Sequence, residues 1–176
     1  MKQYDVYALG NALVDIEYYL EPEKLTSLGI DKGIMTLIDQ KKHEHLVNHL
    51  GESHEKMACG GSAANSLIAL AQMGGRSFFS CSVANDIAGQ FYVEDLKQSG
   101  VDTNTHLQMD DSGITGKCLV FVTPDADRSM NTFLGSSADL DDSYVSEEAI
   151  KESEFIYIEG YLVTDERSRK AVLKAK

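Results

Sequence analysis

Tryptophan is absent from this sequence of 176 residues, which also contains only two prolines and three cysteines. Cys59, Cys81 and Cys118 are odd in number and widely spaced, and no C-x-x-C pair is present. This pattern predicts buried free thiols in a reducing cytoplasm rather than disulfides or a cysteine metal site. No apolar run approaches the ~18 residues of a membrane span, and the N-terminus lacks the apolar core of a signal peptide. We therefore expect a cytoplasmic protein.

Positive charge is also scarce, because 16 lysines and arginines stand against 28 aspartates and glutamates and give a formal net charge of -12. With no basic cluster in the sequence, nucleic acids and anionic membranes are not expected as partners. His45 and His49 lie four residues apart, as a zinc-binding pair can, but no glutamate is placed as in H-E-x-x-H. The surrounding lysines and glutamate favour a solvated helix face, so we expect no metal site.

A glycine pair followed by small residues is the most informative feature that the sequence does have. Gly60 and Gly61 precede Ser62 to Asn65 and a helical run over 66–73. Without a Cβ, the two glycines would let a ligand approach the first turn of the helix, where free N–H groups suit hydroxyls or phosphates. Asn65 would direct its amide at the same space. The alternative is a tight strand-to-helix turn with close packing; neither a Walker A loop nor a G-x-G-x-x-G pattern is present.

A carboxylate near the N-terminus is the second candidate binding group. The apolar run 6–9 predicts a buried strand that ends at Gly10-Asn11, and Asp15 follows within an otherwise apolar stretch. A buried carboxylate costs several kcal/mol unless it is paired or hydrogen-bonded. Asp15 therefore needs a partner, for which sugar hydroxyls would serve, or else it faces solvent from a surface strand.

The order of predicted elements favours an α/β fold. Strands near residues 6, 79 and 157, each followed by a helix, predict a doubly wound sheet that binds ligands at the C-terminal ends of its strands. The segments 106–109 and 117–123 have no helix between them, so we expect antiparallel neighbours in a small separate β-sheet. The elements expected are strands over 6–9, 33–38, 77–83, 101–103, 106–109, 117–123, 128–133 and 155–158, and helices over 22–28, 40–50, 66–73, 88–98, 144–151 (capped by Ser143) and 165–176.

Six short motifs in a fixed order carry a resemblance to a known family. They are 10–16 (GNALVDI), 60–66 (GGSAANS), 86–89 (DIAG), 115–118 (TGKC), 127–130 (DRSM) and 160–161 (GY). With them the chain resembles the PfkB (ribokinase-like) carbohydrate kinases, and within that family it is most similar to adenosine kinases. The resemblance implies a ribokinase-like doubly wound sheet with a small β-sheet lid, formed by strands near 12–19, 34–38, 105–109 and 117–133. It also implies ATP-dependent phosphorylation of a hydroxymethyl group on a sugar or nucleoside, with ATP and Mg²⁺ as cofactors.

The resemblance also assigns roles to individual residues. Asn11 and Asp15 would hold hydroxyls of the acceptor, and Gly60, Gly61, Ser62 and Asn65 would hold it from the other side. Leu13, Leu37 and Tyr161 would line a pocket for a base or a sugar face, with core packing as the alternative. Arg128 would reach from the lid to the transferring phosphate, where a guanidinium suits the charge on the phosphoryl oxygens; the alternative is a surface turn residue. Two copies could pair through their lid strands.

One departure from the family pattern limits these expectations. The catalytic base of the family is the aspartate of a G-A-G-D motif in the C-terminal half, and no such motif occurs here. The chain therefore resembles the N-terminal part of a single kinase domain, with the acceptor site and without the base or the ATP-site half. A non-catalytic nucleoside-binding, sugar-binding or assembly module derived from such a kinase is the alternative. A nucleotide-dependent oxidoreductase would need a glycine-rich fingerprint after the first strand, which 10–13 do not supply.

Overall fold

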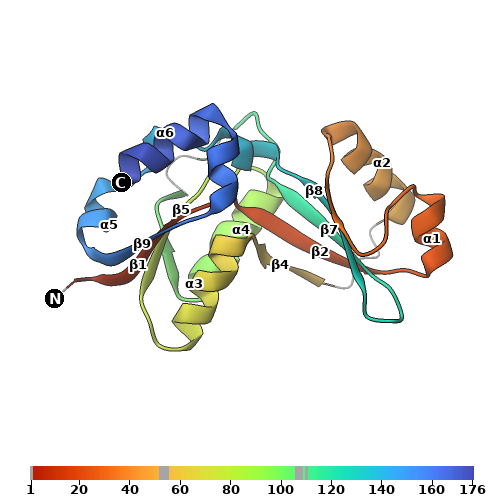
Figure 1. Ribbon diagram of the computed structural model, residues 1–176, viewed down its shortest axis with the longest axis horizontal. Helices are drawn as coiled ribbons and strands as arrows, with labels where there is room; N and C mark the ends of the chain where they lie inside the picture. Colours follow the sequence, from red (N-terminus) through yellow and green to blue (C-terminus); the bar gives the residue numbers. More distant parts are fainter. Residues whose placement is uncertain (1, 52–55, 106–108, 110) are drawn as a thin grey trace.

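The computed structural model describes residues 2–51, 56–105, 109 and 111–176, and the statements below concern these residues. They form two adjoining parts, a body and a lid (Figure 1). The body is built on a four-stranded parallel sheet of order β6-β5-β1-β9. Its strands are β1 Tyr4–Leu9, β5 Ser77–Ser80, β6 Val101–Thr103 and β9 Ser153–Ile158.

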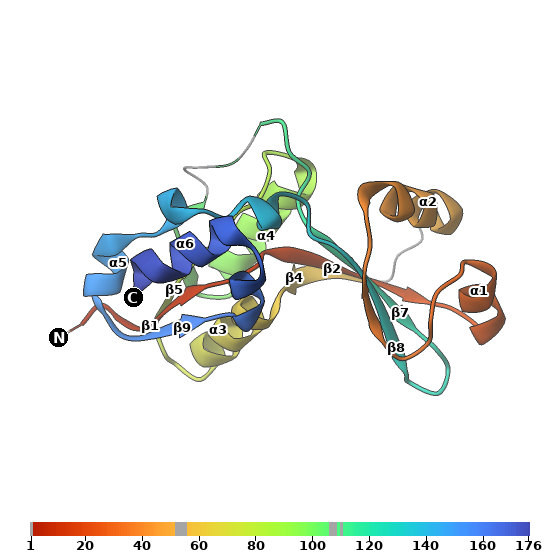
Figure 2. The same ribbon diagram turned by 45° about the horizontal axis from the view of Figure 1, so that its top comes forward.

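Helices cover both faces of the body sheet, as a doubly wound fold requires. One face, which includes Ala8 and Phe79, packs against two long helices, and the other, which includes Tyr7 and Leu9, packs against two helices near the C-terminus (Figure 2). The first pair is α3 Ser62–Gln72 and α4 Ile87–Gln98, and the second is α5 Glu147–Lys151 and α6 Glu166–Ala175. Three short 3₁₀ helices are η2 Gly135–Asp139, η3 Asp142–Tyr144 and η4 Gly160–Thr164.

The lid is a five-stranded mixed sheet of order β3-β8-β7-β2-β4 that extends from one end of the body (Figure 1). Its strands are β2 Leu13–Tyr19, β3 Met35–Leu37, β4 Lys56–Gly60, β7 Lys117–Val122 and β8 Arg128–Phe133. Helices α1 Pro22–Ser27 and α2 Gln40–Leu50 pack on one of its faces through Leu25 and Leu46, which are buried in the same core as Val14 and Ile16. The opposite face of the lid sheet carries Asp15.

Most of the expected elements are confirmed, with local signals marking their ends. Asp39 caps α2 by accepting a hydrogen bond from Lys42 N at 2.8 Å, and Gly51 with φ 68° ends it. Strand β4 was not expected, and α3 begins at Ser62 directly after the glycine pair. The expected strand over 106–109 lies largely outside the described residues; β7 itself pairs with β2 and β8.

The expectation that Ser143 caps a helix is wrong. Ser143 bonds back to Asp141, which caps the short η3, and α5 begins only after Ser146, whose hydroxyl accepts from Ala149 N. The N–H of Ser146 donates to the hydroxyl of Tyr7 in β1, 139 residues away in the sequence. Ser143 and Ser146 look equivalent as caps in the sequence, and this contact with the body sheet favours Ser146 as the cap of α5.

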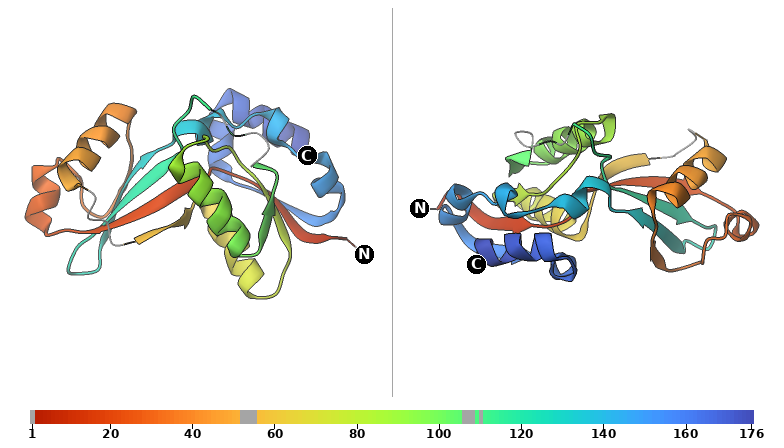
Figure 3. Two further views of the ribbon diagram at one scale, coloured as in Figure 1. Left: turned by 180° about the vertical axis from the view of Figure 1, so that it is seen from behind. Right: turned by 90° about the horizontal axis from the view of Figure 1, so that it is seen from above.

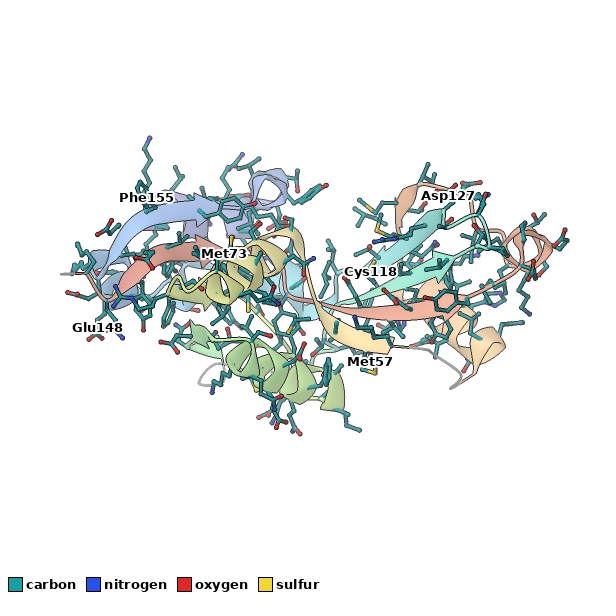
Figure 4. All side chains as sticks on the ribbon, turned by 90° about the horizontal axis from the view of Figure 1, so that it is seen from below. Met57, Met73, Cys118, Asp127, Glu148 and Phe155 are labelled. Atoms are coloured by element: carbon teal, nitrogen blue, oxygen red, sulfur yellow. The ribbon has the colours of Figure 1, made fainter. Side chains whose placement is uncertain are left out.

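Strand β9 forms an open edge of the body sheet. It pairs with β1 alone among the described strands, and its apolar side chains Phe155 (68% exposed), Ile156 (41%) and Tyr157 (39%) face solvent. Figure 4 shows Phe155 projecting away from the sheet at this edge. Among the described residues, no helix is long and apolar enough to cross a membrane.

Candidate functional site

Four chain segments pass between body and lid, and each of them contains a glycine. At Gly61, Gly116 and Gly135 a Cβ would overlap a backbone carbonyl of another segment, so these segments pack backbone against backbone. At Gly60 it would overlap the Asp15 carboxylate, and at Gly10 it would lie 2.5 Å from Glu159 Oε2 and 2.7 Å from Ala63 Cβ. Sequence reasoning found two of these segments as ligand motifs. The four segments are 10–12, 60–61, 115–116 and 134–135.

Asp15 lies directly beside the glycine pair. It is in β2, which pairs with β4 in antiparallel register, and a Cβ on Gly60 would overlap the Asp15 carboxylate. The carboxylate is half-buried and accepts no hydrogen bond from the part of the chain that the structure describes. Burial, with the negative charge of Glu17 as a smaller cause, raises the pKa of Asp15 to about 6. Asp15 and the glycine pair therefore lie side by side, and this arrangement requires glycine at position 60.

Asn11 is held in place by a buried carboxylate that the candidate set did not contain. Glu159, only 4% exposed, follows β9, and it accepts hydrogen bonds from Asn11 N at 3.1 Å and from Asn11 Nδ2 at 3.3 Å. Burial raises the pKa of Glu159, and the hydrogen bonds from Asn11 and from the start of α3 partly offset this effect. Glu159 thus joins the ends of β1 and β9 to the N-terminus of α3.

The first turn of α3 faces the same junction. Gly61 is the residue before the helix and has φ 98°, and a Cβ there would overlap the carbonyl of Asn11. Ser62 and Asn65 are exposed on this first turn, and the N–H of Asn65 closes it on Gly61 O at 3.0 Å. The structure therefore brings Asn11, Gly61 and the first turn of α3 together.

A row of side chains extends from Asp15 across the lid sheet. The strand register aligns Asp15 with Cys118, Cys118 with Thr132, and Thr132 with Leu37, so these residues lie on one face of four adjacent strands. Burial raises the pKa of the Cys118 thiol to about 11, and Thr132 Oγ1 donates to its sulfur at 3.4 Å. At about 4.8 Å per strand, the row is about 14 Å long.

A cavity of about 540 Å³ lies at the Leu37 end of this row. Leu37 is 60% exposed, which excludes core packing as its role. Ser136 is buried in the wall of the cavity, and its hydroxyl has no hydrogen-bond partner among the described residues. The lining includes Leu37, Ile38, Ile114, Thr132, Leu134 and Ser136.

The other predicted pocket residues lie away from this cavity. Leu13 is half-buried against Gly116 at the start of β7. Tyr161 is 60% exposed in η4, which also excludes core packing. Neither residue lines the cavity at Leu37.

Arg128 is placed far from the glycine pair. It begins β8 at the hairpin that forms the tip of the lid, next to Asp127, which Figure 4 labels there. Arg128 is four positions before Thr132 on the same strand, so the two side chains share the face of the lid that carries Asp15. At about 3.3 Å per residue, Arg128 lies about 13 Å from Thr132 along the strand. Its backbone N–H bonds to the Asp127 side chain at 3.0 Å, and its side chain is exposed.

Sequence reasoning assigned no role in the site to Cys118, Thr132 or Glu159. Cys118 and Thr132 look like ordinary positions of an apolar strand pair, and only the register of β2 with β7 and β8 places them beside Asp15. Glu159 did carry a signal, because it is a carboxylate directly after an apolar strand of a parallel sheet, where ligands bind.

The described residues offer no cluster of metal-ligating side chains. They contain no group of three or more His, Cys, Asp and Glu residues that could hold a metal ion. Asp15, Asn11 and the first turn of α3 bring carboxylate, amide and backbone groups to the junction of lid and body, which suits a neutral molecule with several hydroxyls.

The sequence of this chain is similar to sequences of known kinases. The family described as pfkB family carbohydrate kinase matches residues 23–176. The 5-dehydro-2-deoxygluconokinase of Geobacillus thermodenitrificans is 34% identical over 119 residues, which cover 66% of this chain and 35% of that protein. The adenosine kinase of Schizophyllum commune is 28% identical over 172 residues, which cover 93% of this chain and 48% of that protein.

Among solved structures, the adenosine kinase of Sinorhizobium meliloti is similar to this chain, with a TM-score of 0.89 and 36% identity. The similarity covers 98% of this chain and 52% of that one. The chain thus spans about half the length of these relatives, or less.

Proposed function

The chain belongs to the pfkB family of carbohydrate kinases, and we propose that it carries the acceptor-binding half of a kinase that phosphorylates a hydroxymethyl group. The fold is ribokinase-like, as the sequence motifs predicted. One observation carries the proposal above the others: the half-buried Asp15 carboxylate accepts no hydrogen bond from the described residues and lies against Gly60, where a Cβ would overlap it.

In this proposal the ribose or sugar lies between the lid and the first turn of α3. Asp15 accepts hydrogen bonds from two hydroxyls of the acceptor, which replace the water that burial removes. Asn11 is held by Glu159, which uses one of the two N–H groups of Asn11 Nδ2, so Asn11 contributes its side-chain carbonyl and its second N–H. Gly60, Gly61, Ser62 and Asn65 close the space from the side of α3.

A nucleoside fits this half-site better than a simple hexose. The row from Asp15 to Leu37 is long enough for a ribose followed by a base. It ends at a cavity whose lining combines apolar residues such as Ile114 and Leu134 with polar ones such as Thr132 and Ser136. Leu37 would contact the base, and Ser136 would offer it a hydrogen bond. Leu13 and Tyr161 lie away from this cavity and would contact the sugar face. The relatives include both adenosine and sugar kinases, so this choice of acceptor is part of the proposal.

The remaining parts of the reaction lie outside the described half-site. Kinases of this family use ATP, and with Mg²⁺ it would supply the phosphoryl group. Arg128 is the residue of this chain proposed to face that group, since a guanidinium on the lid would offset charge on the phosphoryl oxygens. No step is assigned to a base, because the chain has no G-A-G-D motif.

Calorimetry on the 176-residue chain tests the proposal. Adenosine, other ribonucleosides and a panel of hexoses are titrated into the wild type and into Asp15→Asn. We expect a ribonucleoside to bind and Asp15→Asn to lose this binding, whereas Glu17→Gln, a neighbouring carboxylate on the same strand, retains it. No binding of any nucleoside or sugar, or equal binding by Asp15→Asn, would contradict the proposed site.

A second candidate function is a binding or assembly module without chemistry. The exposed apolar edge at β9 favours it, because such an edge is a template for pairing with another chain. Adding ATP and Mg²⁺ to the chain with its bound nucleoside tests the module: phosphorylated product excludes it, whereas binding without ATP consumption agrees with both candidates. Pairing of two copies through the lid strands stays a prediction.

A further inference from the structure

One body helix, α4, holds two of the four segments that join the lid to the body. It lies where β2 leaves the body, as the left panel of Figure 3 shows, with α4 in green and β2 in orange-red. Its side-chain hydrogen bonds to the lid segments are made by Asp86, Tyr92 and Asp95. These side chains are not among those that would touch the acceptor.

The first attachment is made by Asp86 at the start of α4. One carboxylate oxygen accepts from Thr115 Oγ1 at 2.6 Å and from Gly89 N at 2.8 Å, and the other accepts from Thr115 N at 3.0 Å. Although burial raises it, the pKa of Asp86 is lowered overall by these hydrogen bonds. Thr115 is fully buried, and its hydroxyl also accepts from Ala84 N at 3.1 Å. The start of β7 is thereby fixed to the loop before α4.

The second attachment holds the glycine pair. Tyr92, fully buried in α4, donates its hydroxyl to Gly60 O at 3.2 Å. One turn further along the same helix, Asp95 accepts from Cys59 N at 2.8 Å. Cys59 Sγ donates to Tyr92 O at 3.1 Å, so the end of β4 is attached to α4 at three points. Asp15 pairs with β4 and lies beside Gly60, so its position depends on this attachment.

The other two segments pack on the attached ones. A Cβ on Gly116 would overlap the carbonyl of Leu134, a Cβ on Gly135 would overlap the carbonyl of Ile114, and a Cβ on Gly61 would overlap the carbonyl of Asn11. Because backbones touch directly at these places, a shift of either attached segment moves the others.

We propose that α4 sets the position of the lid relative to the body, and that Asp86, Thr115 and Tyr92 are positioning residues for acceptor binding. The effect on binding rests on the proposed function, whereas the effect on the lid does not. Residues that never touch the acceptor would then control how Asp15 faces Asn11 and the first turn of α3. Such a site must be held to a fraction of an ångström by its supporting contacts.

Spin-label distances between lid and body test this proposal without a ligand. Labels are attached to Glu44→Cys in α2 and Lys170→Cys in α6, both exposed. The three native cysteines are buried, and burial raises the pKa of each thiol, so they react slowly with the label. The test variants are Thr115→Val, Asp86→Asn and Tyr92→Phe. Thr115→Ser is the conservative rescue, because it keeps the hydroxyl.

Asp165→Asn is the matched control. Asp165 caps α6 as Asp86 caps α4, with hydrogen bonds from Arg167 N and Ser168 N, and it has no contact with the lid among the described residues. The wild type should give one narrow distance distribution. We expect Thr115→Val, Asp86→Asn and Tyr92→Phe to broaden or shift it by several ångströms, and Thr115→Ser and Asp165→Asn to leave it unchanged. Nucleoside affinity should fall about tenfold in the three test variants. In Thr115→Ser it should stay within about twofold of the wild-type value.

Each other outcome overturns a defined part of the proposal. Unchanged distances in the test variants, or the same change in Asp165→Asn, overturn the role of α4. If circular dichroism shows that Asp86→Asn or Thr115→Val does not fold, the distances in Tyr92→Phe decide whether α4 positions the lid, because this variant removes only one oxygen. Altered distances with unaltered nucleoside affinity overturn the effect on binding. If the wild type binds no nucleoside or sugar, the proposed function fails, and the distances still decide whether α4 positions the lid.

Discussion

Replacing Asp15 by asparagine should stabilise the fold while it abolishes acceptor binding. Burial first, and repulsion from Glu17 second, raise the pKa of Asp15 from 3.8 to about 6. One pKa unit corresponds to about 1.4 kcal/mol, so the ionised carboxylate destabilises the folded chain by at most about 3 kcal/mol. Solvent screening of a half-buried group reduces this to roughly 1–2 kcal/mol. Asparagine removes the charge and keeps the shape.

The sign of the effect depends on pH. The folded chain holds the proton of Asp15 more tightly than the unfolded chain, so between pH 6 and about 4 the wild type gains stability from Asp15 as the pH falls. Asparagine does not titrate. The advantage of Asp15→Asn is therefore complete above about pH 6 and disappears near pH 4.

Urea unfolding at pH 8 and pH 4, with calorimetry on the same samples, measures both effects. At pH 8 the gain of roughly 1–2 kcal/mol corresponds to a rise in Tm of roughly 2–8 °C. Glu17→Gln is the control, because it removes the repulsion and keeps the carboxylate that binds the acceptor. The reasoning is refuted if Asp15→Asn is no more stable than the wild type at pH 8, or if it retains acceptor affinity.

Three further predictions concern other parts of the site and the lid. Glu159→Gln should lower the free energy of unfolding by about 1–3 kcal/mol and weaken acceptor binding, because an amide N–H would face the N–H donors of Asn11. Urea unfolding measures the first effect and calorimetry the second. Glu154→Gln, at an exposed position of β9, is the control and should change neither. Burial lowers the pKa of His43, so the wild type should lose stability as the pH falls below about 6.5. His43→Leu should lack this loss when the free energy of unfolding is measured from about pH 7.5 to 5. A variant whose stability falls with pH as the wild type's does would contradict the prediction. Gly60→Ala should abolish nucleoside binding in calorimetry, because the added methyl overlaps the acceptor-binding carboxylate, whereas Gly160→Ala, which has open space around it, should bind normally.

Local features of the sequence predicted much of the fold. Period-2 and period-3.6 patterns located most strands and helices, and Asp39 and Gly51 marked the ends of α2 correctly because capping needs only neighbouring residues. The ordered motifs predicted the pfkB family and its ribokinase-like fold, and both are confirmed. The roles of Arg128, Leu13 and Tyr161 stay predictions.

Failures of sequence reasoning occurred where distant contacts decide between equivalent local choices. Ser143 and Ser146 are equally good caps in isolation, and the hydroxyl of Tyr7 selects Ser146. Strand β4 is short, and its pairing with β2 defines it. Glu159 lies 148 residues from Asn11 in the sequence, so nothing local shows that it fixes the amide.

By itself, the sequence determined which residue types could bind a hydroxylated molecule and where the chain must use glycine, because these follow from side-chain chemistry and from the space that a Cβ occupies. The tertiary structure decided that Asp15 lies against Gly60, that Cys118 and Thr132 extend the same face, and that α4 attaches two of the lid's four connections. Strand register and helix packing are set by the sum of many weak long-range contacts, which no single stretch of sequence contains.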